Sequence, residues 1–158
     1  MNGLNMKRRM RNLDLPGVSR GIYDCPFCEL EIAGVERIVE ENELALCIRD
    51  LYPVTAGHSL VIPKRHVLDF FELDEKELLC INRLLVNQRQ VLLEADSSIE
   101  GFNVGANCGI TAGQSVWHCH IHLIPRRKGD TDYPKGGVRH VIPLKDSVHF
   151  NNKQSSSS

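Results

Sequence analysis

The chain has 158 residues and a mass of 17.8 kDa, which suits one domain with its own hydrophobic core and is too little for two. Its 19 Lys and Arg residues against 20 Asp and Glu residues give a net charge of −1, so no overall positive field exists to hold a nucleic acid polymer. The sequence has neither a run of about 18 apolar residues nor a secretory signal, so we expect a cytoplasmic protein without a membrane partner.

The two ends of the chain lack the patterns of folded segments. Residues 1–22 mix basic residues with Asn, Gly and Pro and show no apolar periodicity, which predicts a flexible arm. Residues 151–158 end in a run of serines, which predicts a disordered tail. We therefore expect a single domain over residues 23–150.

Three strands are predicted in the first half of this domain. Residues 37–40 and 44–49 are expected to pair as a hairpin across a short polar turn. Residues 58–62 form a short run that ends at Pro63, which predicts a third strand.

One long helix is predicted after the third strand. Asp74 and Glu77 have the spacing of a capping box, and the helical pattern continues to about Glu94. The expected buried stripe consists of Leu78, Ile81, Leu85 and Leu92.

Two further strands are predicted over residues 102–106 and 116–124, separated by a loop over residues 108–114. Five strands and one crossover helix predict an α+β fold.

Three histidines alternate with other residues in the last predicted strand: His118, His120 and His122. Because side chains alternate between the faces of a strand, we expect the three imidazoles on one face, roughly 6.6 to 7 Å apart. Burying them together requires partners for six ring nitrogens, so a strand selected only for stability would avoid this pattern. The alternation indicates a functional site.

Two kinds of chemistry fit such histidines. Paired histidines are common zinc ligands, but the acidic residue expected soon after them is absent here. A neutral imidazole can instead attack phosphorus or an acyl carbon as a nucleophile. The preceding loop supports this second chemistry, because Gly113 lets backbone approach an anion while Gln114 and Ser115 offer side-chain donors.

Cys25 and Cys28 are separated by two residues, which is the spacing of a chelating pair. The alternatives are two surface thiols or a redox pair. A thioredoxin-like redox pair requires a βαβ context that the sequence lacks.

The segment Q-S-V-W-H-C-H-I-H-L-I over residues 114–124 resembles the signature of the histidine triad (HIT) superfamily. The similarity covers roughly residues 22–145, with upstream matches over residues 39–43, 49–50, 52–54 and 57–66. It implies a HIT-like fold with a five-stranded antiparallel sheet, one long helix and a shorter helical segment, and usually a homodimer. It also implies a nucleotidyl hydrolase or transferase that acts at the α-phosphate of a nucleotide conjugate.

The resemblance implies specific roles for the motif residues. His120 would be the nucleophile that forms a nucleotidyl-histidine intermediate, and His122 would bind the same phosphate and stabilise its charge. Ser115 and Gln114 would form hydrogen bonds with the scissile and leaving-group oxygens.

The resemblance also implies a nucleoside site. Asp50 matches a position that accepts hydrogen bonds from ribose hydroxyls, although an Asp that follows a strand can equally form a turn. Asn107 matches a nucleotide contact, and His58 falls near the sugar or base.

Several relatives resemble this chain in adding two cysteines that bind zinc together with two histidines. The implied ligands are Cys25, Cys28, His66 and His118. Four protein ligands close a tetrahedral site, so this zinc would be structural, and His118 would orient the catalytic segment. No organic cofactor is expected.

Residues 136–143 resemble a segment of the branch nearest the fragile histidine triad proteins, which cleave dinucleoside polyphosphates. The first hypothesis is therefore a zinc-containing HIT hydrolase for a dinucleoside polyphosphate. Alternatives within the family are a phosphoramidate hydrolase and a phosphorylase that uses phosphate as acceptor. Alternatives outside it are a non-catalytic nucleotide-binding regulatory protein and a hydrolase that uses zinc-bound water.

Overall fold

The computed structural model describes residues 25–29 and 35–142. The expected arm over residues 1–22 and the expected tail over residues 151–158 lie outside the described residues. None of the helices in the described part of the chain is long and apolar enough to cross a membrane.

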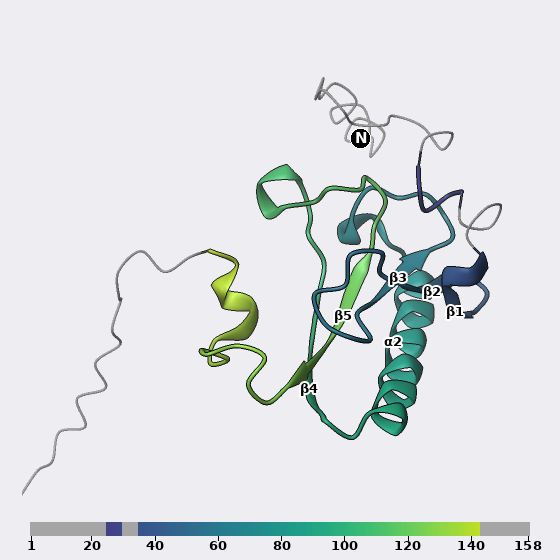
Figure 1. The fold of residues 1–158 in the computed structure, drawn as a ribbon. Coiled ribbons are helices and arrows are strands. Elements are labelled where there is room, and N and C mark those ends of the chain that lie inside the picture. The colour runs from purple at the N-terminus through teal and green to yellow at the C-terminus, as the bar shows by residue number, and fades with distance from the viewer. Residues whose placement is uncertain (1–24, 30–34, 143–158) are drawn as a thin grey trace, which may run out of the picture.

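Five strands form one antiparallel sheet in the order β1-β2-β3-β5-β4. One long helix is found among the described residues, α2 (Glu75–Ala95), and it packs against one face of this sheet (Figure 1). The prediction of an α+β fold with five antiparallel strands and one long helix is confirmed. The strands are β1 (Ile38–Glu41), β2 (Ala45–Arg49), β3 (Ser59–Pro63), β4 (Ile99–Gly105) and β5 (Ile121–Arg127).

Four short 3₁₀ helices connect these elements in the described residues: η2 (Val35–Arg37), η3 (Phe70–Glu72), η4 (Ile110–Ala112) and η5 (Gly137–Val141). The η4 turn lies within the loop before the histidines and ends at Gly113, whose φ of 84° is left-handed. A residue with a Cβ would be strained at this position.

The hairpin of β1 and β2 follows the predicted boundaries within one residue. Asn42 forms its turn, because its Oδ1 accepts hydrogen bonds from the backbone N–H groups of Leu44 and Ala45 at 3.3 and 3.0 Å. Such side-chain bonds explain why Asn is favoured in turns.

Helix α2 begins with the predicted capping box. The Asp74 carboxylate accepts from the Glu77 N–H, and the Glu77 carboxylate accepts from the Asp74 N–H, both at 2.9 Å. Glu77 is only 2% exposed, and Arg65 balances its charge with two hydrogen bonds of 2.8 and 2.7 Å. The hydrogen bonds from Arg65 are the main reason that the pKa of Glu77 is lowered.

The predicted buried stripe of α2 is wrong in part. Of the four apolar residues expected there, only Ile81 is buried. The buried face consists of Glu77, Cys80, Ile81, Leu84 and Gln88. The buried face of α2 can include two polar residues because both have hydrogen-bond partners. Glu77 accepts from Arg65, and Gln88 donates to the Ser59 hydroxyl at 3.2 Å.

The two faces of the sheet carry separate apolar clusters. Ala45, Cys47 and Val61 pack with α2 on one face. Leu46, Ile48, Leu60 and Ile62 pack with Phe27 and Cys25 on the other. His122 pairs with Leu60 across the β3–β5 ladder, so its side chain belongs to the face opposite α2.

The last predicted strand starts later than expected, at Ile121 instead of residue 116. The preceding residues are held by loop contacts, since the Cys119 N–H donates to the carbonyl of Val67 at 2.8 Å. The β3–β5 ladder ends at the pair of Val61 and Ile121, and Pro63 has no N–H to extend it. Only His122 of the three histidines therefore lies within a strand.

Candidate active site and metal centre

His120 is fixed by a bond to its own chain segment. Its Nδ1 lies 2.8 Å from the carbonyl oxygen of His118, which can only accept, so Nδ1 carries the proton. The lone pair is thereby left on Nε2, the atom that would act as a nucleophile. The ring is 6% exposed and packs edge-on against Phe27 and His122, with centroid separations of 5.4 and 5.1 Å.

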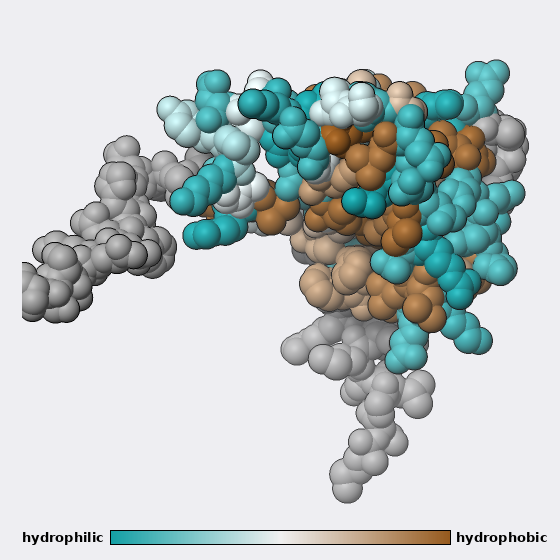
Figure 2. All heavy atoms as spheres, turned by 90° about the horizontal axis from the view of Figure 1, so that it is seen from below, coloured by the Kyte–Doolittle hydropathy of each residue, from teal (hydrophilic) through white to brown (hydrophobic). Residues whose placement is uncertain are grey.

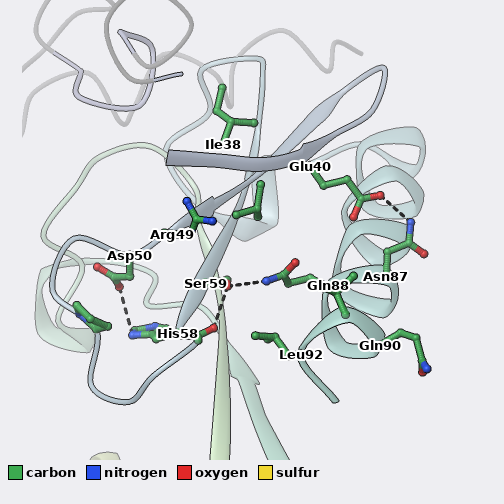
Figure 3. A pocket seen from close by; sticks show the side chains of 14 residues that line it. Ile38, Glu40, Arg49, Asp50, His58, Ser59, Asn87, Gln88, Gln90 and Leu92 are labelled. Atoms are coloured by element: carbon green, nitrogen blue, oxygen red, sulfur yellow. Dashed lines mark hydrogen bonds and ion pairs between the residues drawn. The ribbon is translucent and has the colours of Figure 1, made fainter. Parts of the chain in front are cut away.

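His122 contacts a second histidine, His58, which lies immediately before β3. His58 Nε2 lies 3.0 Å from His122 Nδ1, and His58 Nδ1 lies 3.4 Å from the Asp50 carboxylate. Figure 3 shows the Asp50 carboxylate directed at the His58 ring. Asp50, His58 and His122 therefore lie in a row, and we call these three residues the relay; the contact between Asp50 and His58 is an ion pair only when His58 is protonated.

The backbone fixes the order of protons in the relay. The Val54 N–H donates to His58 Nδ1 at 3.3 Å, so a neutral His58 carries its proton on Nε2. That proton is donated to His122 Nδ1. His122 then carries its own proton on Nε2, where it can donate to an oxygen of a bound phosphate.

Both relay histidines favour the neutral form. Burial lowers the pKa of His58, although the nearby Asp50 carboxylate opposes this shift. Burial, followed by the charges of His120 and His58, lowers the pKa of His122 to about 4. At neutral pH His122 is thus a neutral donor rather than an imidazolium ion.

The lowered pKa of His122 makes stability depend on pH. As pH falls from about 6.5 to about 4, the unfolded chain binds this proton before the folded chain, so folding stability is lost across that window. We expect wild type to lose about 2 kcal/mol more free energy of unfolding than His122→Gln between about pH 7.5 and pH 4.5, as measured by urea unfolding. The exposed His140 supplies the matched variant, His140→Gln, which should follow wild type. Equal losses in wild type and His122→Gln would refute the expected shift.

A second cluster brings together all four residues expected to bind zinc. Cys25 Sγ and Cys28 Sγ lie 3.4 and 3.5 Å from His118 Nδ1, and Cys28 Sγ lies 3.2 Å from His66 Nδ1. Zinc bonds of about 2.3 Å to sulfur and 2.0–2.1 Å to nitrogen place tetrahedral S and N ligands about 3.5 Å apart. The donor set and its spacing therefore fit a closed four-ligand metal site.

A hydrogen bond on the far ring nitrogen of His118 orients the ring toward this cluster. Its Nε2–H donates to the carbonyl of Pro63 at 2.8 Å, which leaves the Nδ1 lone pair toward the sulfur atoms. Burial is the main cause that lowers the pKa of His118 to about 4, so the ring is neutral as a ligand must be. His118 is 1% exposed and therefore lies in the protein interior.

Two cavities flank His58. One, of about 950 Å³, is lined by His58, His122, Asn107 and Gly113, which brings three predicted substrate-binding residues beside His122. Its wall also includes apolar residues of η5. The other, of about 930 Å³, is lined by Asp50 and Arg49 and shares His58 with the first (Figure 3).

The two expected hydrogen-bonding residues of the loop differ in their surroundings. Ser115 is exposed, whereas Gln114 is 5% exposed and uses both donor hydrogens on the carbonyls of Leu68 and Val116, at 2.6 and 3.1 Å. Its Oε1 accepts from the Gly109 N–H at 2.7 Å. In this structure Gln114 shapes the loop, and its contact with a leaving-group oxygen stays a prediction.

Sequence reasoning missed the roles of Phe27, Val54 and Pro63. Phe27 lies between the two cysteines in sequence and packs against both His118 and His120, at 5.8 and 5.4 Å. The only signal was its place within the chelating pair. The contributions of Val54 and Pro63 are backbone groups, which residue identity does not reveal.

The five-stranded antiparallel sheet, with His118, His120 and His122 at and just before the start of β5, is typical of histidine triad proteins. The HIT domain model matches residues 34–129, more than half of the chain. The chain belongs to the HIT family, whose members are generally nucleotide hydrolases or transferases.

Several relatives are similar over most of the chain. An uncharacterized HIT-like protein of Mycoplasma genitalium, MG132, is 39% identical over 65% of this chain and 72% of its own. The adenylylsulfatase HINT3 of Arabidopsis thaliana is 35% identical over 77% of this chain, and the AP-4-A phosphorylase of Mycobacterium tuberculosis is 33% identical over 75%. The chain spans 62% of the length of each of these two enzymes.

A zinc-bound histidine triad family protein of Mycobacterium smegmatis has a similar solved structure. It superposes with a TM-score of 0.63 and 32% identity, over 70% of this chain and 81% of its own.

Proposed function

We propose that this protein is a nucleotidyl hydrolase or transferase that cleaves at the α-phosphate of a nucleotide conjugate, with a dinucleoside polyphosphate as the first candidate. The observation that carries the proposal is the bond from His120 Nδ1–H to the His118 carbonyl. It presents an unprotonated Nε2 beside His122, which can donate to the same phosphate.

The reaction takes place in two displacements. His120 Nε2 attacks the α-phosphorus, a P–N bond forms, and the bond from phosphorus to the leaving group breaks. Water or inorganic phosphate then attacks the same phosphorus, and the P–N bond to His120 breaks. A hydrolase thereby releases a nucleoside monophosphate, whereas a phosphorylase releases a nucleoside diphosphate.

The neighbouring residues have distinct tasks in this scheme. His122 Nε2–H stabilises the charge that builds on the phosphate oxygens, and its orientation depends on His58. The Asp50 carboxylate, with a side chain 14% exposed, accepts from ribose hydroxyls. The exposed hydroxyl of Ser115 donates to the scissile or leaving-group oxygen.

The named relatives support a nucleotide conjugate and leave its leaving group open, because one is an adenylylsulfatase and another an AP-4-A phosphorylase. The test is to incubate purified protein with diadenosine tetraphosphate, adenylyl sulfate and an adenosine phosphoramidate, each with and without phosphate. Product identification distinguishes hydrolysis from phosphorolysis. Tight binding of these compounds without turnover would instead support a nucleotide-binding regulatory protein.

The Cys2His2 cluster is proposed to hold a structural zinc ion. The matching donor spacing supports this, as does the zinc-bound relative from Mycobacterium smegmatis. When bound, zinc would tie the segment of Cys25 and Cys28 to the loop that carries His118. His118 therefore serves as an anchor two residues before the nucleophile, and no organic cofactor enters the scheme.

A homodimer is proposed through the free edge of the sheet. β4 is an edge strand, and a groove of about 440 Å³ between β4 and α2 is lined by apolar residues that include Leu78, Leu85 and Val104. Figure 2 shows a hydrophobic patch, in brown, on one face of the molecule. A second copy covering this edge would satisfy its backbone groups and bury the groove.

Val104→Lys is expected to weaken the dimer by at least about 30-fold, because Lys would place a charge in the apolar contact. Light scattering coupled to size exclusion measures the effect as a shift toward monomer mass. The control is Val86→Lys, which changes a 56% exposed residue of α2 outside the groove and should leave the mass unchanged. A monomeric wild type, or a dimer unaffected by Val104→Lys, would contradict this assembly.

A further inference from the structure

The relay residues also form a set of metal ligands that is separate from the Cys2His2 cluster. One donor atom from each of Asp50, His58 and His122 lies within 4.8 Å of the donor atoms of the other two. We propose that these three relay residues bind a divalent transition-metal ion in an open site, and that the bound ion inhibits the protein by disabling the relay.

The sequence pattern alone does not identify the carboxylate of this site. No acidic residue follows the histidines closely, which argued against a catalytic type of metal site. The sheet supplies one from 72 positions earlier, because Arg49 pairs with Ser59 in β2–β3 and Leu60 pairs with His122 in β3–β5. These registers bring Asp50, His58 and His122 to neighbouring strand ends.

The spacing is close to what an ion requires. Bonds of about 2.0–2.2 Å to nitrogen and oxygen place tetrahedral ligands roughly 3.3–3.6 Å apart. His58 Nε2 and His122 Nδ1 are 3.0 Å apart, and one carboxylate oxygen of Asp50 lies within 4.8 Å of a ring nitrogen of each histidine. Side-chain rotations that bring the Asp50 carboxylate nearer to these nitrogens would place an ion among the three residues.

Two histidines and one carboxylate leave coordination positions open, which is typical of exchangeable rather than structural sites. The positions can be filled by water, because His58 borders both cavities and His122 borders one of them. Both imidazoles are neutral at physiological pH, so an ion need not displace a proton from an imidazolium.

Metal binding and the relay exclude each other. The relay places one proton between His58 Nε2 and His122 Nδ1, whereas an ion bound by both nitrogens requires a lone pair from each. The ion also takes the Asp50 carboxylate, which the proposed function assigns to ribose. The inhibitory consequence rests on that proposed function, but the ion site itself does not.

The experiment is a Co²⁺ titration of the zinc-loaded protein, followed by visible absorption and by metal analysis. We expect one additional ion per chain, with visible bands but without the sulfur-to-metal charge transfer that Co²⁺ at Cys25 and Cys28 would show. Asp50→Asn and His122→Gln should each weaken this binding by more than the roughly 10–100-fold lost when only a ligand's supporting partner is removed. Asp130→Asn, which changes a carboxylate paired with Arg126, should bind as wild type does.

Two further readouts separate the site from its consequence. Adenosine monophosphate at saturation should displace the added ion, and the ion should inhibit wild-type turnover at the concentration that fills the site. A protein that takes up no additional ion, or keeps it in Asp50→Asn, overturns the proposal even if turnover through His120 is intact. Conversely, an ion that binds as expected to a protein without turnover contradicts the proposed function and leaves the site standing.

Discussion

Replacing His120 with alanine is expected to lower turnover of a nucleotide conjugate by at least about 10⁴-fold, since removal of a nucleophile eliminates the covalent route. The fold should survive, because the ring makes one hydrogen bond, to a backbone carbonyl two residues away. Steady-state kinetics on the best substrate of the panel measures the loss, with circular dichroism as the check on folding.

Two companion variants sharpen this prediction. His122→Gln should cost less than His120→Ala, about 10²–10³-fold, because it removes stabilisation of charge but keeps the nucleophile. His140→Ala changes an exposed histidine outside the site and should match wild type. Turnover in His120→Ala near the wild-type level would contradict nucleophilic catalysis by His120 and favour attack by a water molecule.

The second large effect is expected at the Cys2His2 cluster. Cys25→Ser should lower zinc content to well below one ion per chain and lower the melting temperature by about 10 °C, which corresponds to about 2–4 kcal/mol. The physical reason is that Cys25 is 2% exposed and packs with the apolar face opposite α2, so losing the ion loosens a buried contact. Differential scanning calorimetry and metal analysis measure both quantities.

Cys108→Ser is the matched control, because Cys108 is a partly buried thiol outside the cluster. It should retain full zinc content and nearly the wild-type melting temperature. Chelation of wild type should reproduce the effect of Cys25→Ser and cost stability before chemistry. If chelation abolished turnover while melting stayed unchanged, zinc-bound water would be the better account of catalysis.

Local patterns were sufficient to predict most of the fold. The turn at Asn42 and the capping box of Asp74 and Glu77 act between residues a few positions apart, and both are found as expected. The buried face of α2 was not predictable from apolar spacing. It depends on Arg65, which reaches the helix from outside and makes a buried Glu77 tolerable.

The predicted start of the last strand was wrong for a related reason, since the strand begins at Ile121. Alternation correctly separated Cys119 and Ile121, which pack with α2, from His122 on the other face. Alternation cannot show where a partner strand ends, and here the ladder stops before His120. The bond from Cys119 to Val67, which replaces the ladder, is a tertiary contact without a sequence signature.

The candidate site, too, could be predicted from the sequence only in part. The spacing of Cys25 and Cys28 indicates chelation, but the histidines that meet Cys28 lie 38 and 90 positions away and were identified only through the family resemblance. The relay was not foreseen, because Asp50 and His58 were each assigned to the nucleoside. Strand register joins them to His122, and register is a property of the whole sheet.

The central claim is that His120 carries the nucleotidyl group, and covalent trapping tests it most directly. Protein mixed with excess substrate is quenched within the first turnover in alkaline denaturant, digested and analysed by mass spectrometry. We expect one nucleotidyl group on the peptide that contains His120, and no such adduct in His120→Ala. Absence of any adduct during active turnover, or its location on His122, would contradict the account.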